Sequence, residues 1–251
     1  MTCDGEAHWY LSVKCIRAAS SAVLALQEIY NKILKHWGME SCKPLSIPFP
    51  GKSDVVLDEL LKPIENPDPV LNKQFQEIIG QLLYCQQQTV PEISWYVSIL
   101  AHFTTKAGAP HMAIAKKVLR YLQGRKRIPL RWCARSCQQP HLPGHIYDYA
   151  GASFADIKHE RLSSMGYVFI INNGAVSWRS SRTPLATLRV AECEVVARSA
   201  ATQEAVYLRK LAKELGFTQI SPTTLYEDCT AGPLVSLWDA SPPDDDASSD
   251  K

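Results

Sequence analysis

Four potential metal ligands lie at intervals of four residues: Cys133, Cys137, His141 and His145. Thiolate and imidazole groups are the ligands that zinc prefers, and four of them could hold one ion tetrahedrally. Pro140 and Pro143, however, prevent a helix that would bring these side chains onto one face. The spacing also matches none of the usual zinc-binding patterns. We therefore do not expect zinc here.

Positive charge is concentrated along one predicted helix and its exit, at Lys116, Lys117, Arg120, Arg125, Lys126 and Arg127. Lys116 and Arg120 are four residues apart and share a helix face. Such residues can contact phosphate groups in a salt-sensitive, sequence-independent way. A solvated helix face would have the same pattern, and both interpretations stay open. Trp178, Arg179 and Arg182 could line a second nucleic-acid groove, although Trp178 suits a core position equally well.

Composition excludes several classes of protein. The chain has 46% hydrophobic and 21% charged residues with a net charge of +2, which is typical of globular proteins and gives no overall attraction to nucleic acid. Its apolar runs are too short to cross a bilayer, and its first residues do not resemble a signal peptide. We expect no membrane partner and an intracellular protein, cytoplasmic or nuclear. The eight cysteines include no CxxC pair, which favours reduced thiols.

The first part of the chain combines strand and helix patterns. Two apolar runs, 9–16 and 22–27, predict a hairpin, and the helical pattern of 29–37 ends at Gly38. Residues 42–50 contain three prolines and predict an extended connector. Residues 51–73 are polar and interrupted by prolines, as is typical of a linker.

Three helices are predicted next, over 75–87, 91–103 and 110–122, with Gly124 just past the last. Their apolar faces include Ile78, Leu82, Ile99 and Leu100.

Strand patterns replace the helical ones from residue 128. We expect strands at 128–133, 145–150, 166–171 and 175–179, and Asn-Gly chemistry at 172–174 predicts a type I′ turn. A long amphipathic helix follows over 190–215, with Gly216 as its end and an apolar stripe of Ala197, Ala201, Leu208, Leu211 and Leu215. A last strand is expected at 223–227. This order predicts an α+β or α/β fold with mixed strand pairing.

Eight short blocks occur in one order along the chain: Trp9–Val13, Gly38–Pro48, Ile79–Tyr84, Pro91–Trp95, Ala115–Gly124, Gly166–Phe169, Ser177–Trp178 and Ala191–Glu194. The ordered set resembles the Pol polyprotein of copia-type (Pseudoviridae) LTR retrotransposons. It corresponds to the C-terminal reverse transcriptase thumb and connection plus the ribonuclease H-like domain.

The resemblance implies an α+β organisation in five parts. Residues 1–50 would be the end of the reverse transcriptase palm and thumb, 51–73 a linker, 74–127 a predominantly helical connection region, 128–238 a truncated ribonuclease H-like domain with a mixed sheet and one long helix, and 239–251 an acidic disordered tail. The paired polymerase aspartates of the family lie before the position that matches Met1, so no polymerase activity is expected. With palm and fingers missing, we expect uncovered apolar faces at Ile78, Leu82, Ile99 and Leu100, and poor solubility.

The resemblance also implies a nuclease site with two Mg²⁺ ions. The family motif Tyr-x-Asp-Ala-Asp-Trp/Phe-Ala-Gly matches residues 149–156, where Gly151 replaces the first aspartate and Ser153 the second. Only Glu194 and Asp228 match catalytic metal ligands. Two such ions about 4 Å apart repel by roughly 16 kcal/mol at an effective dielectric of 20, which two carboxylates offset less than three or four. We therefore expect that Mg²⁺, the ancestral cofactor, is no longer held.

Asp148 and Asp156 are the nearest carboxylates that could replace the one missing at 151. Using Asp148 requires a shift of three residues, and an odd shift reverses the side chain's face in a strand. Glu192 is expected to be a solvated helix residue. Three hypotheses follow: a truncated, inactive Pol fragment, which is favoured; a non-catalytic module that binds an RNA–DNA hybrid or other nucleic acid; and a residual magnesium-dependent ribonuclease H. The pattern leaves the oligomeric state open.

Overall fold

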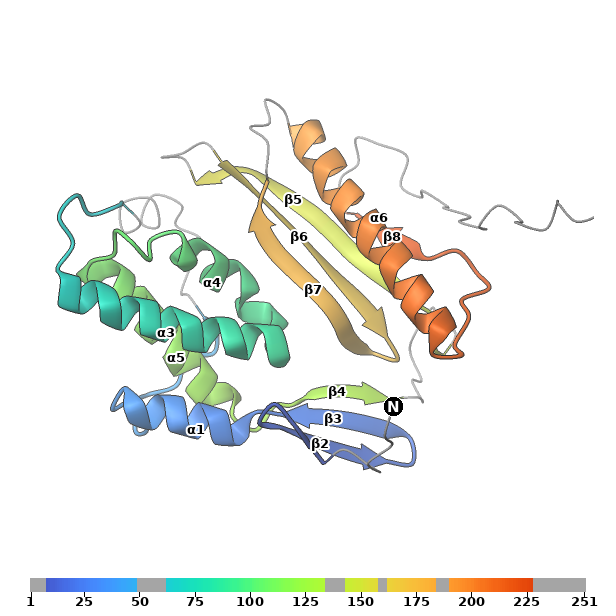
Figure 1. Ribbon diagram of the computed structural model, residues 1–251, viewed down its shortest axis with the longest axis horizontal. Coiled ribbons are helices and arrows are strands. Elements are labelled where there is room, and N and C mark those ends of the chain that lie inside the picture. The colour runs from blue at the N-terminus through green and yellow to red at the C-terminus, as the bar shows by residue number, and fades with distance from the viewer. Residues whose placement is uncertain (1–7, 49–61, 134–142, 158–161, 184–189, 228–251) are drawn as a thin grey trace, which may run out of the picture.

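The computed structural model describes residues 8–48, 62–133, 143–157, 162–183 and 190–227 (Figure 1). Within these ranges the protein contains five α-helices and two four-stranded sheets, an α+β composition as predicted. The first sheet and four of the helices come from residues 9–133. The second sheet and the longest helix come from the second half.

The first sheet has the strand order β1-β2-β3-β4. Strands β2 (Val13–Ala18) and β3 (Ser21–Ala25) form the predicted hairpin. The strand predicted over 9–16 is interrupted, because Leu11 and Ser12 have φ of 47° and 63° and turn the chain between β1 (Trp9–Tyr10) and β2. Strand β4 (Leu130–Cys133) pairs antiparallel with β3. Residues 128–238 were predicted as one domain; β4 pairs with β3 of the first sheet, and its last residue, Cys133, also donates its backbone N to the Asn172 carbonyl at 2.8 Å.

Four helices pack on one another: α1 (Gln27–His36), α3 (Pro69–Gln88), α4 (Ser94–Ala101) and α5 (Ala109–Arg125). The predicted starts and ends need three corrections. Helix α3 begins at Pro69 rather than at 75, because Asp68 accepts a hydrogen bond from the Val70 backbone N at 2.9 Å and caps the helix. Residues 91–93 form a 3₁₀ turn before α4. Helix α5 continues past Gly124 instead of ending before it.

The apolar faces of these helices are covered. Ile78 and Leu82 are fully buried, and Ile99 and Leu100 are 4% and 1% exposed. The expectation that they are left partly uncovered is therefore wrong. They belong to one core with Val13, Leu26 and Leu34, and α3 and α4 cover these faces by packing on each other, on α5 and, for α4, on β7.

The second sheet has the order β7-β6-β5-β8. Strands β5 (Tyr147–Ile157), β6 (Leu162–Ile171) and β7 (Gly174–Arg182) pair antiparallel, and β8 (Thr224–Tyr226) pairs parallel with β5. The predicted mixed pairing is confirmed. Helix α6 (Val190–Glu214) connects β7 to β8 and packs on β5 and β6 (Figure 1).

Helix α6 has a different buried stripe from the predicted one at its end. Leu211 and Leu215 are 37% and 64% exposed, whereas Cys193, Glu194 and Ala205 are buried. The predicted end is confirmed: Gly216 has a φ of 83°, and the Phe217 backbone N donates to the Ala212 carbonyl.

The turn between β6 and β7 uses Asn172 and Asn173, whose φ values are 49° and 68°. The predicted turn is present, but its two central residues are the two asparagines rather than the Asn-Gly pair. Gly174 is instead the first residue of β7 and lies tightly against β4.

We expect Gly174→Ala to lower the free energy of unfolding by roughly 1 to 3 kcal/mol through overpacking. A Cβ atom at 174 would lie 2.6 Å from the Arg131 carbonyl oxygen and against the Trp132 ring, so β4 and β7 would have to separate. Urea denaturation measures the change. Gly80→Ala, on an exposed helix position with nothing within 4 Å, is the control and is expected to be neutral or stabilising. Equal stability of Gly174→Ala and wild type would contradict this close contact.

Candidate functional site

The position of the first family aspartate faces away from the long helix. Gly151 lies in β5, where it pairs with Gly166 of β6. Ile146 and Ala150, in and just before the same strand, pack against α6 in the second core. Because side chains alternate along a strand, Gly151 and Ser153 belong to the opposite face. Neither position can therefore direct a ligand toward Glu194 while β5 keeps this register.

Asp148 lies on the face of β5 that α6 covers. It alternates with Ile146 and Ala150, and its side chain is 0% exposed. Neither of its carboxylate oxygens has a hydrogen-bond partner among the described residues. Burial raises the pKa of Asp148 to about 7, and the charge of Glu227 adds to the shift. In the sequence, the three-residue spacing between Asp148 and Gly151 argued against Asp148 as a replacement ligand. In the structure, the same spacing puts Asp148 on the face of β5 that α6 covers and Gly151 on the opposite face. Asp156 lies in the part of β5 whose side chains are not described.

Glu194 lies in the first half of α6, the helix that packs against the second sheet. Its side chain is 6% exposed, and its neighbour Cys193 is fully buried with its Sγ donating to the Ser163 Oγ at 3.2 Å. Glu192 is exposed, as predicted. The structure therefore buries the glutamate that matches the family's ligand and leaves the other one at the surface.

Glu227 follows β8 directly and forms an ion pair with Arg198 of α6. The Arg198 Nε donates to the Glu227 Oε1 at 2.6 Å, and its Nη2 donates to the Oε2. The Glu227 side chain is only 7% exposed. Sequence reasoning did not find this pair. Nothing in the sequence showed that the helix carrying Arg198 and the strand end carrying Glu227 would meet. Asp228 itself lies outside the described residues.

The side chains at these positions do not supply the ligands that a pair of magnesium ions needs. Mg²⁺ requires oxygen ligands in nearly octahedral geometry. Gly151 supplies no side-chain oxygen, Asp148 takes up a proton near neutral pH, and both oxygens of Glu227 are used by Arg198. Over the described part of the chain, no group of three or more His, Cys, Asp or Glu side chains is placed to hold a metal ion.

The predicted basic group is divided between surface and interior. Lys116 and Arg127 are exposed, and Lys117, Arg120 and Lys126 are half-buried. The Arg120 Nε donates to the Lys43 carbonyl at 2.8 Å, which brings the chain around Lys43 onto α5.

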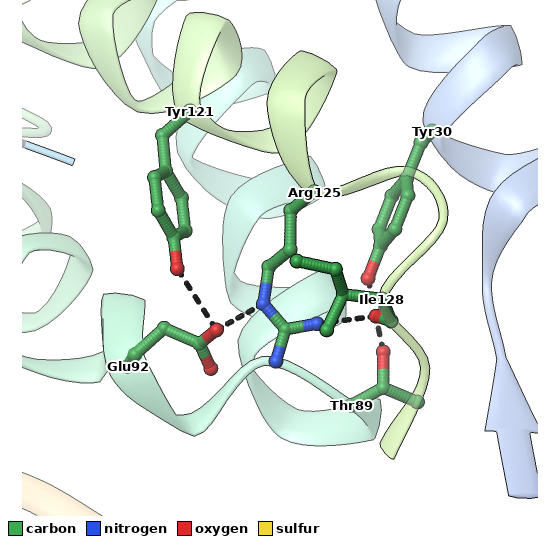
Figure 2. A network of polar contacts seen from close by, with 6 residues as sticks. All are labelled: Tyr30, Thr89, Glu92, Tyr121, Arg125 and Ile128. Carbon is green, nitrogen blue, oxygen red and sulfur yellow. Dashed lines mark hydrogen bonds and ion pairs between the residues drawn. The ribbon is translucent and has the colours of Figure 1, made fainter. Parts of the chain in front are cut away.

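Arg125 does not belong to this surface. It is 8% exposed, and Figure 2 shows its guanidinium between two acceptors. The Nε donates to the Glu92 carboxylate, and the Nη1 donates to the Ile128 carbonyl at 2.7 Å. The Tyr121 hydroxyl donates to the same Glu92 oxygen at 2.9 Å. Arg125 thus holds α5 to the turn before α4, and it is removed from the phosphate-binding candidates.

Two further sequence candidates have different outcomes. Trp178 and Arg179 line a cleft of about 420 Å³ between β7 and the end of α3, together with Gln86, Gln87 and Tyr167. The Trp178 indole N donates to the Gln86 carbonyl at 3.0 Å, so its ring joins the two halves of the protein.

Of the four spaced zinc candidates, Cys137 and His141 lie outside the described residues. No described helix is both long and apolar enough to span a membrane.

Comparison with known proteins identifies relatives among transposon polyproteins. The chain is 29% identical over 217 residues to the retrovirus-related Pol polyprotein from transposon TNT 1-94 of Nicotiana tabacum, covering 86% of this chain and 16% of that protein. It is 23% identical over 223 residues to the corresponding polyprotein from transposon RE1 of Arabidopsis thaliana, covering 89% of this chain and 14% of that one. The chain therefore spans only a small part of these polyproteins.

A shorter relative is covered almost completely. The chain is 32% identical over 137 residues to the secreted RxLR effector protein 161 of Plasmopara viticola, which is 55% of this chain and 92% of that protein. No family model matches the chain. No solved structure matches it either.

Proposed function

The chain belongs to the copia-type retrotransposon Pol family, and we propose that it is a Pol fragment whose second half keeps a ribonuclease H-like fold without nuclease activity. Three antiparallel strands, a long helix and a strand parallel to the first support this fold, because they follow the order of elements that the family resemblance implies. Residues 74–127, with α4, α5 and most of α3, then correspond to the reverse transcriptase connection region, and residues 1–50 to the end of its palm and thumb. These residues pack around a core of their own.

One observation carries the proposed loss of activity. The carboxylate that should begin the metal site is replaced by Gly151, on the sheet face away from Glu194, and the nearest carboxylates on the α6 face are buried or bound to arginine. Hydrolysis by two metal ions requires several carboxylates that converge on both ions. Without such convergence the chain supplies neither an activated water nor a stabilised leaving oxygen.

A cleavage assay on a labelled RNA–DNA hybrid tests this proposal. We expect no cleavage above the buffer background with Mg²⁺ or Mn²⁺, for the wild type and for Glu194→Gln alike. The variant matters because a contaminating nuclease would act equally in both preparations. Divalent-dependent cleavage by the wild type that Glu194→Gln abolishes would show that the chain is an active ribonuclease H.

A second candidate function is non-catalytic binding of nucleic acid. It is favoured by the exposure of Lys116 and Arg127 and by the position of Lys43 beside Arg120. Sequence-independent phosphate contacts of this kind weaken steeply with salt.

We expect Lys116→Glu/Arg127→Glu to weaken hybrid binding and to lower the salt slope of the binding constant by about one for each phosphate that the protein no longer neutralises. Filter binding at several salt concentrations measures both quantities. Lys213→Glu, an exposed lysine at the far end of α6, is the matched control. Equal binding by both variants, or none by wild type at low salt, would remove this candidate.

A further inference from the structure

The first turn of α5 contains a histidine that is fully buried. His111 is 0% exposed, and its ring lies against the Phe103 ring, with 4.6 Å between the ring centroids. The Phe75 ring of α3 makes an edge-on contact with it at 6.1 Å. A free imidazole gains or loses its charge within the physiological pH range. The charge state of His111 is therefore important for the core formed by α3, α4 and α5.

The hydrogen bonds of the ring suit only its neutral form. The Gly108 backbone N donates to the His111 Nδ1 at 3.1 Å, so Nδ1 is an acceptor and carries no proton. The proton of the neutral ring is then on Nε2, which is buried and has no hydrogen-bond partner among the described residues. An imidazolium has a proton on both nitrogens and would keep neither an acceptor for Gly108 nor a partner of its own.

The bond from Gly108 to His111 closes the start of α5. Gly108 is the residue before the helix, and its carbonyl accepts from the Met112 backbone N at 3.1 Å. His111 thus takes the place that a glutamine or glutamate has in a capping box. The chain just before the helix is held to α3, because the Asn72 Oδ1 accepts from the Ala107 backbone N at 3.1 Å.

We infer that His111 is an acid-sensitive switch, and that protonation of its Nδ1 opens the start of α5. Three effects act in this direction. The proton removes the acceptor of the Gly108 N–H, it creates a charge between apolar rings, and it places this charge at a helix N-terminus, where the helix dipole disfavours cations. The inference is independent of the proposed function, since it involves neither a metal ion nor nucleic acid.

The charged side chains on the elements that pack against His111 are exposed. They are Lys73 and Glu77 on α3, Lys62, Glu65 and Asp68 in the chain before α3, and His102 and Lys106 between α4 and α5. On α5 itself the nearest charge is Lys116, which is exposed as well. Burial lowers the pKa of His111 below its usual value of 6.5. The position therefore favours the neutral ring.

The sign of the pH effect follows from this lowered pKa. When the start of α5 is open, His111 takes up a proton near pH 6.5, whereas in the closed protein it does so only at lower pH. Above about pH 6.5 the ring is neutral in both states, and the closed state is fully favoured. Below it, the open state gains by up to about tenfold for each pH unit, until the closed protein is protonated too.

Hydrogen exchange of two backbone amides, followed by NMR, measures the opening. The Gly108 amide is bonded to His111 itself, and the Met112 amide is bonded to the Gly108 carbonyl. We expect the protection factors of both amides to fall by about five- to thirtyfold between pH 7.5 and pH 5. The Phe217 amide, which donates to the Ala212 carbonyl at the end of α6, should show no such fall.

His111→Gln is the matched variant, because its amide oxygen can accept from the Gly108 N–H and does not titrate. It should keep the protection of both amides at pH 5. His111→Phe cannot accept this bond and should have low protection at both pH values, without the dependence on pH. His8→Gln replaces an exposed histidine and should behave as wild type. If His111→Phe does not fold, the comparison with His111→Gln decides.

Two results would overturn the inference. One is undiminished protection of the Gly108 and Met112 amides in the wild type at pH 5. The other is an equal loss of protection in wild type and His111→Gln, which would mean that another group causes the response to acid. Neither result bears on cleavage of a hybrid, so this inference and the proposed loss of nuclease activity fail separately.

Discussion

Replacing Arg125 with methionine is expected to lower the free energy of unfolding by roughly 2 to 4 kcal/mol, somewhat less than for a fully buried pair because Glu92 keeps part of its solvent contact. The Arg125 side chain is 9% exposed and the Glu92 side chain 34%. The substitution removes the guanidinium from Glu92, which keeps the Tyr121 hydroxyl as a donor, and it removes the donor to the Ile128 carbonyl (Figure 2). Urea denaturation measures the decrease.

Arg127→Met is the matched control for this experiment, since it removes an exposed arginine two residues away. It is expected to change stability by less than about 0.5 kcal/mol. Arg125→Lys should recover only part of the stability, because one ammonium group cannot reproduce the fork that contacts Glu92 and Ile128 together. If Arg125→Met is as stable as Arg127→Met, Arg125 does not hold α5 to the turn before α4.

The second large effect is a dependence of stability on pH that Asp148 causes. The pKa of Asp148 rises from 3.8 to about 7 on folding, chiefly because of burial. The unfolded chain therefore releases this proton near pH 4, while the folded protein keeps it until near pH 7. The free energy of unfolding should fall as the pH rises between these values, by on the order of 4 kcal/mol over the whole interval.

Asp148→Asn should remove this part of the pH dependence and be more stable than wild type at pH 8. Urea denaturation at a series of pH values measures the difference between the two proteins. Glu214→Gln changes an exposed carboxylate at the end of α6 and should leave the profile of the wild type unchanged. Parallel profiles for Asp148→Asn and wild type would mean that Asp148 is not buried as a titrating group.

Local patterns in the sequence predicted most of the elements. The helix that ends at Gly38, the hairpin at β2 and β3, and the long helix that ends at Gly216 all depend on residues near in the chain, where positive φ or periodicity leaves a direct signal. The start of α3 was placed too late although Asp68-Pro69 has the chemistry of a helix start. The prolines of residues 51–73 predicted a linker up to residue 73, although Asp68 within it can cap a helix.

Long-range contacts explain what the sequence could not predict. The partner of β4 is a strand more than a hundred residues earlier, and no feature of residues 128–133 distinguishes β3 from β5 as a neighbour. Arg125 has the sequence context of a surface charge, and only the approach of Glu92 makes it a buried ion pair. The face of Asp148 likewise depends on where α6 lies, because alternation along a strand fixes two sides without saying which one is covered.

The candidate site shows the same limit. The resemblance to the Pol family identified Gly151, Glu194 and Asp228, but it gave no reason to examine Arg198 or Glu227. The ion pair between these two residues joins α6 to the end of β8, a contact between segments about thirty residues apart in the chain.

The most direct measurement is an anomalous difference map from a wild-type crystal grown with Mn²⁺. We expect the Arg198 guanidinium on Glu227 and no manganese peak beside Glu194, Glu227 or Asp228. Two peaks about 4 Å apart at these carboxylates, the separation typical of two-metal nucleases, would contradict the proposed loss of nuclease activity.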